Sequence, residues 1–221
     1  PQVIEVVVID SSINDTDQAK GEPDVTVNGK ILRMVQGVDG NWYGYFADKT
    51  MAITADATST VAKEGIDFGS FCNQNDNFAI LGATLPQFTD TAGVAVPSST
   101  EGVSGATALA AGGTITSACT GDVGPNDANN VVRQSKLPSQ IPGLGGAIGQ
   151  LGLTTKTEWP FIQLYNLNPT GNVVVQYNKG GGAQTTTLTF DSVSQFAKVS
   201  LDRAVYPTSS GVMATITDLW L

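Results

Sequence analysis

Hydrophobic residues follow the two-residue period of β-strands along the first third of the chain. The run Val3–Ile9 is rich in β-branched residues and nearly continuous, which favours a strand of the protein core. Asn28-Gly29 and Asp39-Gly40 separate further β-rich runs, and both pairs are favoured in tight hairpin turns. This part therefore predicts one strand followed by a meander, with the later strands at 24–27, 30–35 and 41–47.

Strand patterns return in the last third of the chain. The predicted strands lie at 161–166, 172–178, 183–190, 199–201 and 212–217. The glycine-rich run at 179–182 joins the second and third of these strands as a hairpin. No segment combines the spacing and the capping residues of a helix longer than two turns.

The middle of the chain, residues 54–158, has few periodic segments. Gly, Ala, Ser and Thr make up 19 of the 24 residues from Ser98 to Gly121. We expect a long, loop-rich insertion here, and the pattern leaves open whether it forms a second small β subdomain.

Together the patterns predict an all-β fold, an immunoglobulin-like β-sandwich with a long central insertion rich in Gly, Ala, Ser and Thr. Residues 1–221 form one sandwich unit, with its strands mainly in 3–53 and 159–217. Trp42 is the candidate for the tryptophan that packs between the two sheets. The predicted core comprises Val6, Val8, Val27, Leu32, Trp42, Phe46, Phe161, Leu164, Val173, Val175, Leu188, Phe190 and Ile216.

The charge of the chain limits the classes of partner that it is expected to bind. Charged residues make up 14% of the sequence, the net charge is −9, and residues 1–67 hold eleven acidic against five basic side chains. Nucleic acid and anionic membranes need a cationic surface, so neither is an expected partner, whereas cations are. No apolar run approaches the roughly 20 residues of a membrane-spanning helix, so no membrane insertion is expected.

Catalytic chemistry has little support in the sequence. The chain contains no His, which removes the usual general base and the commonest metal-binding nitrogen. No nucleophile elbow, P-loop or Ser-x-x-Lys motif is present. The glycine-rich run 143–149 lacks the preceding core strand that a dinucleotide site needs. We therefore expect a protein that is not an enzyme.

One acidic loop, residues 10–24, is a candidate metal site. Ca²⁺ takes six to eight oxygen ligands, and a loop this rich in carboxylates can supply several of them. The alternative is a solvated acidic loop without a specific ion. Asn14-Asp15-Thr16 is also an N-glycosylation sequon, with Asn14 as the acceptor. The candidate ligands are Asp10, Asp15, Asp17, Glu22 and Asp24.

The two cysteines, Cys72 and Cys119, lie outside any zinc or redox spacing. In a secreted protein they would most simply form a disulfide, and two buried free thiols are the alternative.

The two ends of the chain resemble each other. Residues 3–13 read VIEVVVIDSSI and residues 211–221 read GVMATITDLWL, so that Asp10 aligns with Asp218, Val8 with Ile216 and Ile4 with Val212. Tandem surface domains repeat in this way, so we expect one internal unit cut from a longer protein. The last strand then either completes this sandwich or belongs to the next one.

Several long segments resemble the surface-layer (S-layer) proteins of ammonia-oxidising archaea. They include VIEVVVIDSSINDTDQAKGEPDVTVNGK, LRMVQGVDGNWYGYFADKT, WPFIQLYNLNPTGNVVVQYNKGGG and SLDRAVYPTSSGVMATITDLWL, in this order along the chain. The resemblance implies a secreted cell-surface protein of tandem β-sandwich domains without catalytic residues. Copies of such a protein assemble into a two-dimensional acidic lattice that is permeable to ammonium, and divalent cations commonly support such lattices.

Two other functions compete with this interpretation. An extracellular adhesin or filament subunit is also rich in β-structure. A carbohydrate-binding module would need exposed aromatic side chains, and Trp42, Tyr43 and Tyr45 form the only dense aromatic group.

Overall fold

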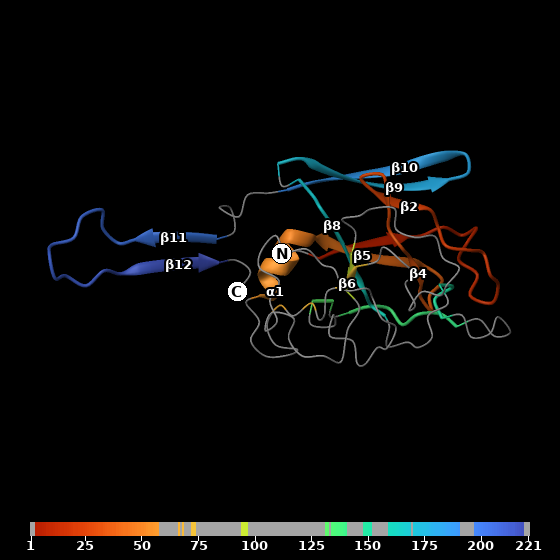
Figure 1. The fold of residues 1–221 in the computed structure, drawn as a ribbon, viewed down its shortest axis with the longest axis horizontal. Helices are drawn as coiled ribbons and strands as arrows, with labels where there is room; N and C mark the ends of the chain where they lie inside the picture. The colour runs from red at the N-terminus through yellow and green to blue at the C-terminus, as the bar shows by residue number, and fades with distance from the viewer. Residues whose placement is uncertain are drawn as a thin grey trace.

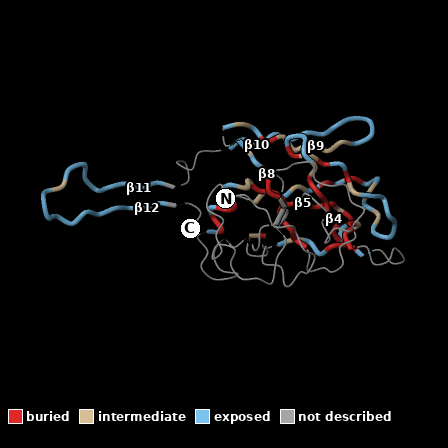
Figure 2. The backbone as a smooth tube through the Cα atoms, viewed as in Figure 1, coloured by how far each residue is buried: buried red, intermediate tan, exposed pale blue. Residues whose placement is uncertain are grey.

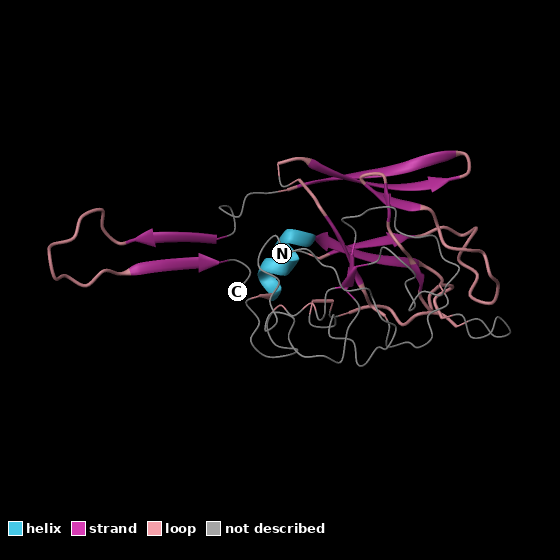
Figure 3. Ribbon diagram, viewed as in Figure 1, coloured by secondary structure: helices cyan, strands magenta, loops and turns pink. Residues whose placement is uncertain are grey.

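The protein is built almost entirely from β-strands, which confirms the predicted all-β class. The computed structural model describes residues 3–57, 66, 68, 72–73, 94–96, 131–132, 134–140, 148–151, 159–168, 170–190 and 197–218. Within these residues there is one short helix among twelve strands. Figure 3 shows the strands in magenta and the helix in cyan. The finer immunoglobulin-like assignment stays a prediction.

The first sheet, which we call sheet A, has six strands in the order β1-β5-β8-β7-β6, with β4 beside the start of β5. Its strands pair antiparallel except for β5 and β8, which run parallel. The strands are β1 (Ile4–Val8), β4 (Val35–Gln36), β5 (Trp42–Asp48), β6 (Cys72–Asn73), β7 (Val94–Val96) and β8 (Ile162–Tyr165).

The second sheet, sheet B, has four strands in the order β10-β9-β2-β3. They are β2 (Val25–Val27), β3 (Lys30–Ile31), β9 (Asn172–Lys179) and β10 (Gly182–Thr189). Asn28 and Gly29 join β2 to β3 with φ of 50° and 79°, so this turn uses the left-handed conformation that the Asn-Gly signal predicts. Figure 1 shows β10, β9 and β2 lying above the strands of sheet A.

A hydrophobic core fills the space between the two sheets. Trp42 and Phe46 of β5 have no exposed surface and pack here, which confirms the sandwich position predicted for Trp42. The rings of Phe46 and Tyr165 meet edge to face, with their centroids 6.1 Å apart. The buried members of this core are Val8, Val25, Val27, Leu32, Met34, Trp42, Phe46, Tyr165 and Val173.

A second core covers the opposite face of sheet A. It is built around Tyr43 and Tyr45 of β5 and helix α1 (Lys49–Asp56). Its further buried members include Val132, Ile148, Leu151, Trp159 and Phe161. Asp48 caps the helix by accepting a hydrogen bond from the Met51 backbone N–H at 2.8 Å. No helix in the described part of the chain is long and apolar enough to cross a bilayer.

The last two strands, β11 (Ala197–Leu201) and β12 (Ala214–Asp218), pair with each other and with no other described strand. This hairpin stands clear of the body in Figure 1, and Figure 2 colours it as exposed along most of its length. Ile216 is 71% exposed, so its predicted place in the core is wrong, because its strand joins neither sheet of the sandwich. Phe190, just after the sheet-edge strand β10, is also exposed and is not a core residue.

Two other expectations fall on the central insertion. Its strand β7 pairs with β8 and so adds to sheet A. Most of residues 54–158 lie outside the described residues, as do Cys119 and the side chain of Cys72. The disulfide and a separate subdomain therefore stay predictions.

Replacing Phe46 by Ala should lower the free energy of unfolding by about 3–5 kcal/mol, because it empties a fully buried ring site between the sheets. Phe190→Ala is the matched control and should lower it by only about 1–2 kcal/mol, since Phe190 is already 39% exposed. Urea unfolding followed by tryptophan fluorescence measures both. Equal losses for the two variants would contradict this core.

Candidate functional site

The acidic loop, residues 10–24, crosses from the end of β1 to the start of β2, and Asp10 fixes its first turn. Asp10 Oδ1 accepts hydrogen bonds from the Ser12 N–H at 2.9 Å and the Ser12 hydroxyl at 2.7 Å. Its Oδ2 accepts from the Tyr177 hydroxyl at 2.9 Å and lies 2.7 Å from Lys179 Nζ. Because Tyr177 and Lys179 belong to β9, Asp10 joins the end of β1 in sheet A to sheet B.

The contacts of Asp10 lower the pKa of its own carboxyl and raise the pKa of the Tyr177 hydroxyl. The Lys179 ammonium, with the hydrogen bonds from Ser12 and Tyr177, holds the pKa of the Asp10 carboxyl well below its usual range. Burial and the bond to Asp10 raise the pKa of Tyr177 to about 12. Asp10 is therefore a charged structural group across the whole physiological range.

The next turn of the acidic loop is held by the central tryptophan and by a glycine. Trp42 Nε1 donates to the Ile13 carbonyl at 2.9 Å, so the indole of the core also fixes the loop above it. Gly40 has φ of 85°, and a Cβ placed on it would lie 2.4 Å from the Asn14 carbonyl oxygen. Only glycine fits this contact without a shift of the backbone.

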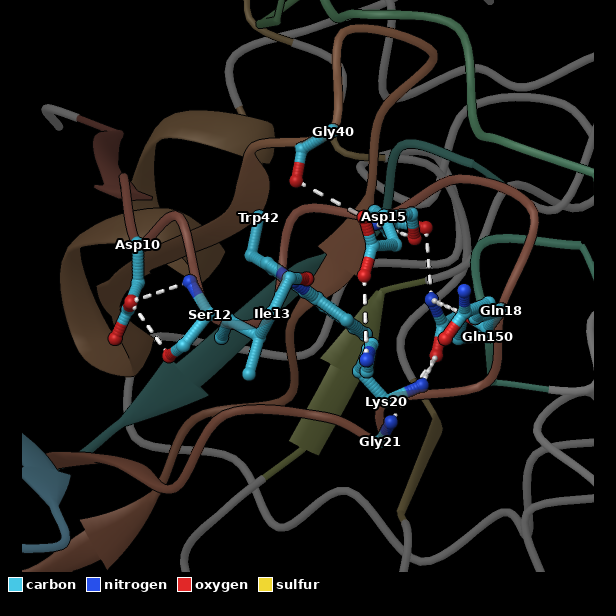
Figure 4. A network of polar contacts seen from close by, with 11 residues as sticks. Asp10, Ser12, Ile13, Asp15, Gln18, Lys20, Gly21, Gly40, Trp42 and Gln150 are labelled. Atoms are coloured by element: carbon cyan, nitrogen blue, oxygen red, sulfur yellow. Dashed lines mark hydrogen bonds and ion pairs between the residues drawn. The ribbon is translucent and has the colours of Figure 1, made fainter.

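The middle of the loop is held by amide side chains from distant parts of the chain (Figure 4). Gln150 Oε1 accepts from the backbone N–H groups of Lys20 and Gly21, at 3.2 and 3.1 Å. Its Nε2 donates to Gln36 Oε1 at 2.8 Å, and Gln36 Nε2 donates to the Asp15 carbonyl at 2.9 Å. Gln36 is fully buried, so this network satisfies a polar group of the interior while it holds the loop.

The end of the loop carries a nearly buried ion pair. Arg33 is 1% exposed, and its Nε and Nη2 donate to the Glu22 carboxylate at 2.6–3.0 Å. Glu22 also accepts a hydrogen bond from the Met34 N–H at 2.7 Å. A buried charge is stable in a folded protein when it lies beside an opposite charge and its remaining polar atoms are hydrogen-bonded. Arg33 and Glu22 supply the opposite charges here, and the Met34 N–H supplies Glu22 with a further hydrogen bond.

The five predicted metal ligands do not meet at one point. Asp10 and Glu22 are taken up by the contacts above, Asp15 pairs with Lys20 at 3.2 Å, and Asp24 accepts from Asn178 Nδ2 at 3.1 Å. Among the described residues, no three His, Cys, Asp or Glu side chains form a group that could hold a metal ion.

Calcium binding and glycosylation both depend on exposed side chains of the acidic loop. Calcium at this loop stays a prediction, and an ion there would compete with the observed pairs. Asp17 and Asp24 are exposed and Asp15 is half-exposed, so these three carboxylates are more open to cations than Asp10 and Glu22. Asn14 is exposed as well, and its glycosylation stays a prediction.

The dense aromatic group is not a surface platform. Trp42, Tyr43 and Tyr45 are 0%, 6% and 2% exposed. The tyrosine hydroxyls are satisfied by carboxylates, with Tyr43 donating to Asp39 at 2.6 Å and Tyr45 to Glu5 at 2.7 Å. These rings therefore cannot stack on a sugar, which is what a carbohydrate-binding module would require of them.

Sequence reasoning missed the basic and amide partners of the loop. Arg33 had a signal, because a lone charge between Leu32 and Met34 in a strand-like run indicates a buried charge that needs a partner. Gln36 and Gln150 had none, since exposed and buried glutamines look alike in sequence. Their separation of 114 residues also hides their contact.

Gly40→Ala should lower the free energy of unfolding by at least about 2 kcal/mol, because it adds a clash with the Asn14 carbonyl to an unfavourable φ. Gly21→Ala is the matched control, since it has the same φ of 85° but no atom within 4 Å of the added Cβ. Its cost should be about 1 kcal/mol, from the backbone alone. Chemical denaturation measures the loss of stability in both variants. Equal losses would contradict the close contact between Gly40 and Asn14.

Asp10→Asn should remove a pH-dependent part of the stability. A carboxyl whose pKa is lowered by folding contributes fully above its unfolded pKa of about 3.9 and loses this contribution as pH falls toward the folded pKa. The stability difference between wild type and Asp10→Asn should be constant from pH 5 to 8 and shrink below about pH 4. Thermal unfolding across this range, with exposed Asp17→Asn as the control, measures it. A difference that does not change with pH would contradict the assignment.

Comparisons with protein families and with curated proteins give no guide to the function. No family model matches the chain, and no curated protein matches it. The likeness to S-layer proteins therefore rests on the sequence segments themselves.

Proposed function

We propose that the chain is a non-catalytic structural module of a cell-surface lattice, an S-layer. The observation that carries this proposal is the exposed hairpin of β11 and β12. Six large hydrophobic side chains on it are 56–82% exposed, namely Val199, Leu201, Val205, Val212, Met213 and Ile216. Monomeric soluble proteins rarely leave such a group uncovered, so it favours a module that is completed by assembly.

The internal contacts of the acidic loop support the same proposal. Its most buried carboxylates hold neighbouring strands together and are already paired, which suits a load-carrying module better than a catalytic site. The net charge of −9 would draw cations toward an assembled layer and, in the S-layer setting, favour passage of ammonium over anions. We include Ca²⁺ as a lattice cation in the proposal.

An adhesin or filament subunit is the second candidate. The exposed hairpin also favours this function, because a surface that docks on a different site of the next copy joins copies end to end. The two functions differ in the symmetry of the assembly, which is planar for a lattice and linear for a filament.

Electron microscopy of the concentrated chain, with millimolar calcium and with a chelator, tests the proposal. We expect ordered planar sheets whose extent increases with calcium. Filaments in place of sheets would favour the second candidate. Dispersed single particles under both conditions would contradict an assembly function for this chain.

A further inference from the structure

The hairpin of β11 and β12 has one apolar face that nothing in the described structure covers. Val199 pairs with Ile216 and Leu201 with Ala214, so these four side chains lie on the same face. Ser200 and Thr215 lie opposite each other on the other face. A two-stranded hairpin is marginally stable in water by itself, so this face needs a partner.

The sandwich has a matching gap at one edge. Asp10, at the end of β1, contacts Tyr177 and Lys179 of β9, whereas the Tyr165 hydroxyl of β8 donates to the Ile31 carbonyl of β3. These contacts align β1 with β9 and β8 with β3. Since β10 lies beyond β9, sheet B extends one strand past the edge of sheet A.

Burial agrees with this alignment. The side chains of Gln184, Thr186 and Leu188 share the inner face of β10 with the β9 residues Tyr177, Val175 and Val173 opposite them. Gln184 and Thr186 are exposed and Leu188 is only partly buried, although their face is turned toward the core. Among the described strands, β1 has a partner on one side only. No strand of the described part of the chain therefore occupies the position next to β1, beneath β10.

The hairpin has the pattern that this position needs. Val212, Ala214 and Ile216 repeat the alternation of Ile4, Val6 and Val8, which face the core from β1. In the hairpin, β12 has this pattern and pairs with β11. The free edge of β1 therefore offers β11 a similar partner. The charges of the hairpin balance, because Lys198 and Arg203 are matched by Asp202 and Asp218, so the hairpin brings no net negative charge toward residues 1–67, which have six more acidic than basic side chains.

We propose that the hairpin of one copy docks on a second copy, with β11 added antiparallel to the free edge of β1 and its apolar face beneath β10. The inference rests on the proposed function, and it names the joint between copies. Added backbone hydrogen bonds supply affinity and the apolar face supplies specificity, as in other cases of strand addition. The contact is heterologous, since each copy donates a hairpin at one end and receives one at the other.

Two single variants separate donor from recipient. Ile216→Lys places a charge on the docking face of the hairpin, and Thr186→Lys places one in the open position beneath β10. Each should weaken self-association at least about tenfold in sedimentation velocity. The controls are Thr215→Lys and Thr185→Lys, which change exposed residues on the opposite faces of the same strands and should associate like the wild type.

Mixing the two impaired variants gives the decisive result. The Ile216→Lys copy keeps an intact recipient edge and the Thr186→Lys copy keeps an intact hairpin. An equimolar mixture should therefore form one-to-one dimers and nothing larger. A mixture that stays monomeric would overturn the proposal.

Other outcomes identify the alternatives. If Thr186→Lys associates normally while Ile216→Lys does not, the hairpins pack on each other, and the proposed joint is wrong. If the wild type is monomeric and Ile216→Lys lowers only its melting temperature, the hairpin docks on its own body, and the joint is again wrong. If every variant still forms sheets, the joint is wrong but the lattice function stands.

Discussion

The packing of β5 on both of its faces is the constraint on which the rest of this fold depends. Alternate side chains of one strand enter two different cores, with Trp42 and Phe46 facing sheet B and Tyr43 and Tyr45 facing the layer of helix α1. A strand buried on both sides cannot slip by one residue, because a slip would exchange these two sets of aromatic rings. The register of sheet A, and with it the position of the β1 edge, follows from this strand.

The acidic loop joins sheet A to sheet B through side-chain contacts. The indole of Trp42 holds Ile13, the Glu22–Arg33 pair holds the end of the loop, and Asp10 reaches Lys179 on β9. Four of the five carboxylates that the sequence suggests as metal ligands, Asp10, Asp15, Glu22 and Asp24, each contact a different partner in the structure. Most carboxylates of this loop therefore hold the fold together, and in the described part of the chain the hairpin and the free edge of β1 are left without such contacts.

The all-β class and most strand positions could be predicted from the sequence, because alternation and turn dipeptides such as Asn28-Gly29 are local signals. Several contacts of the acidic loop could not, since they join residues more than 100 positions apart, such as Lys20 with Gln150 and Asp10 with Lys179. Helix α1 was missed because it is only eight residues long, although Asp48 was available as its cap. Ile216 was misplaced because alternation shows that a strand has an apolar face but not which molecule covers it.

An uncovered apolar face and an open sheet position on the same chain account for each other if the two meet between copies. Hydrogen exchange as a function of protein concentration tests this most directly, because backbone amides of an edge strand become protected only when a new strand pairs with them. If the hairpin docks on β1 of a second copy, amides of β1 and of both hairpin strands exchange more slowly as protein concentration rises, while the exchange rates of β2 and β5 do not change. Exchange in β1 and the hairpin that is independent of concentration would contradict it.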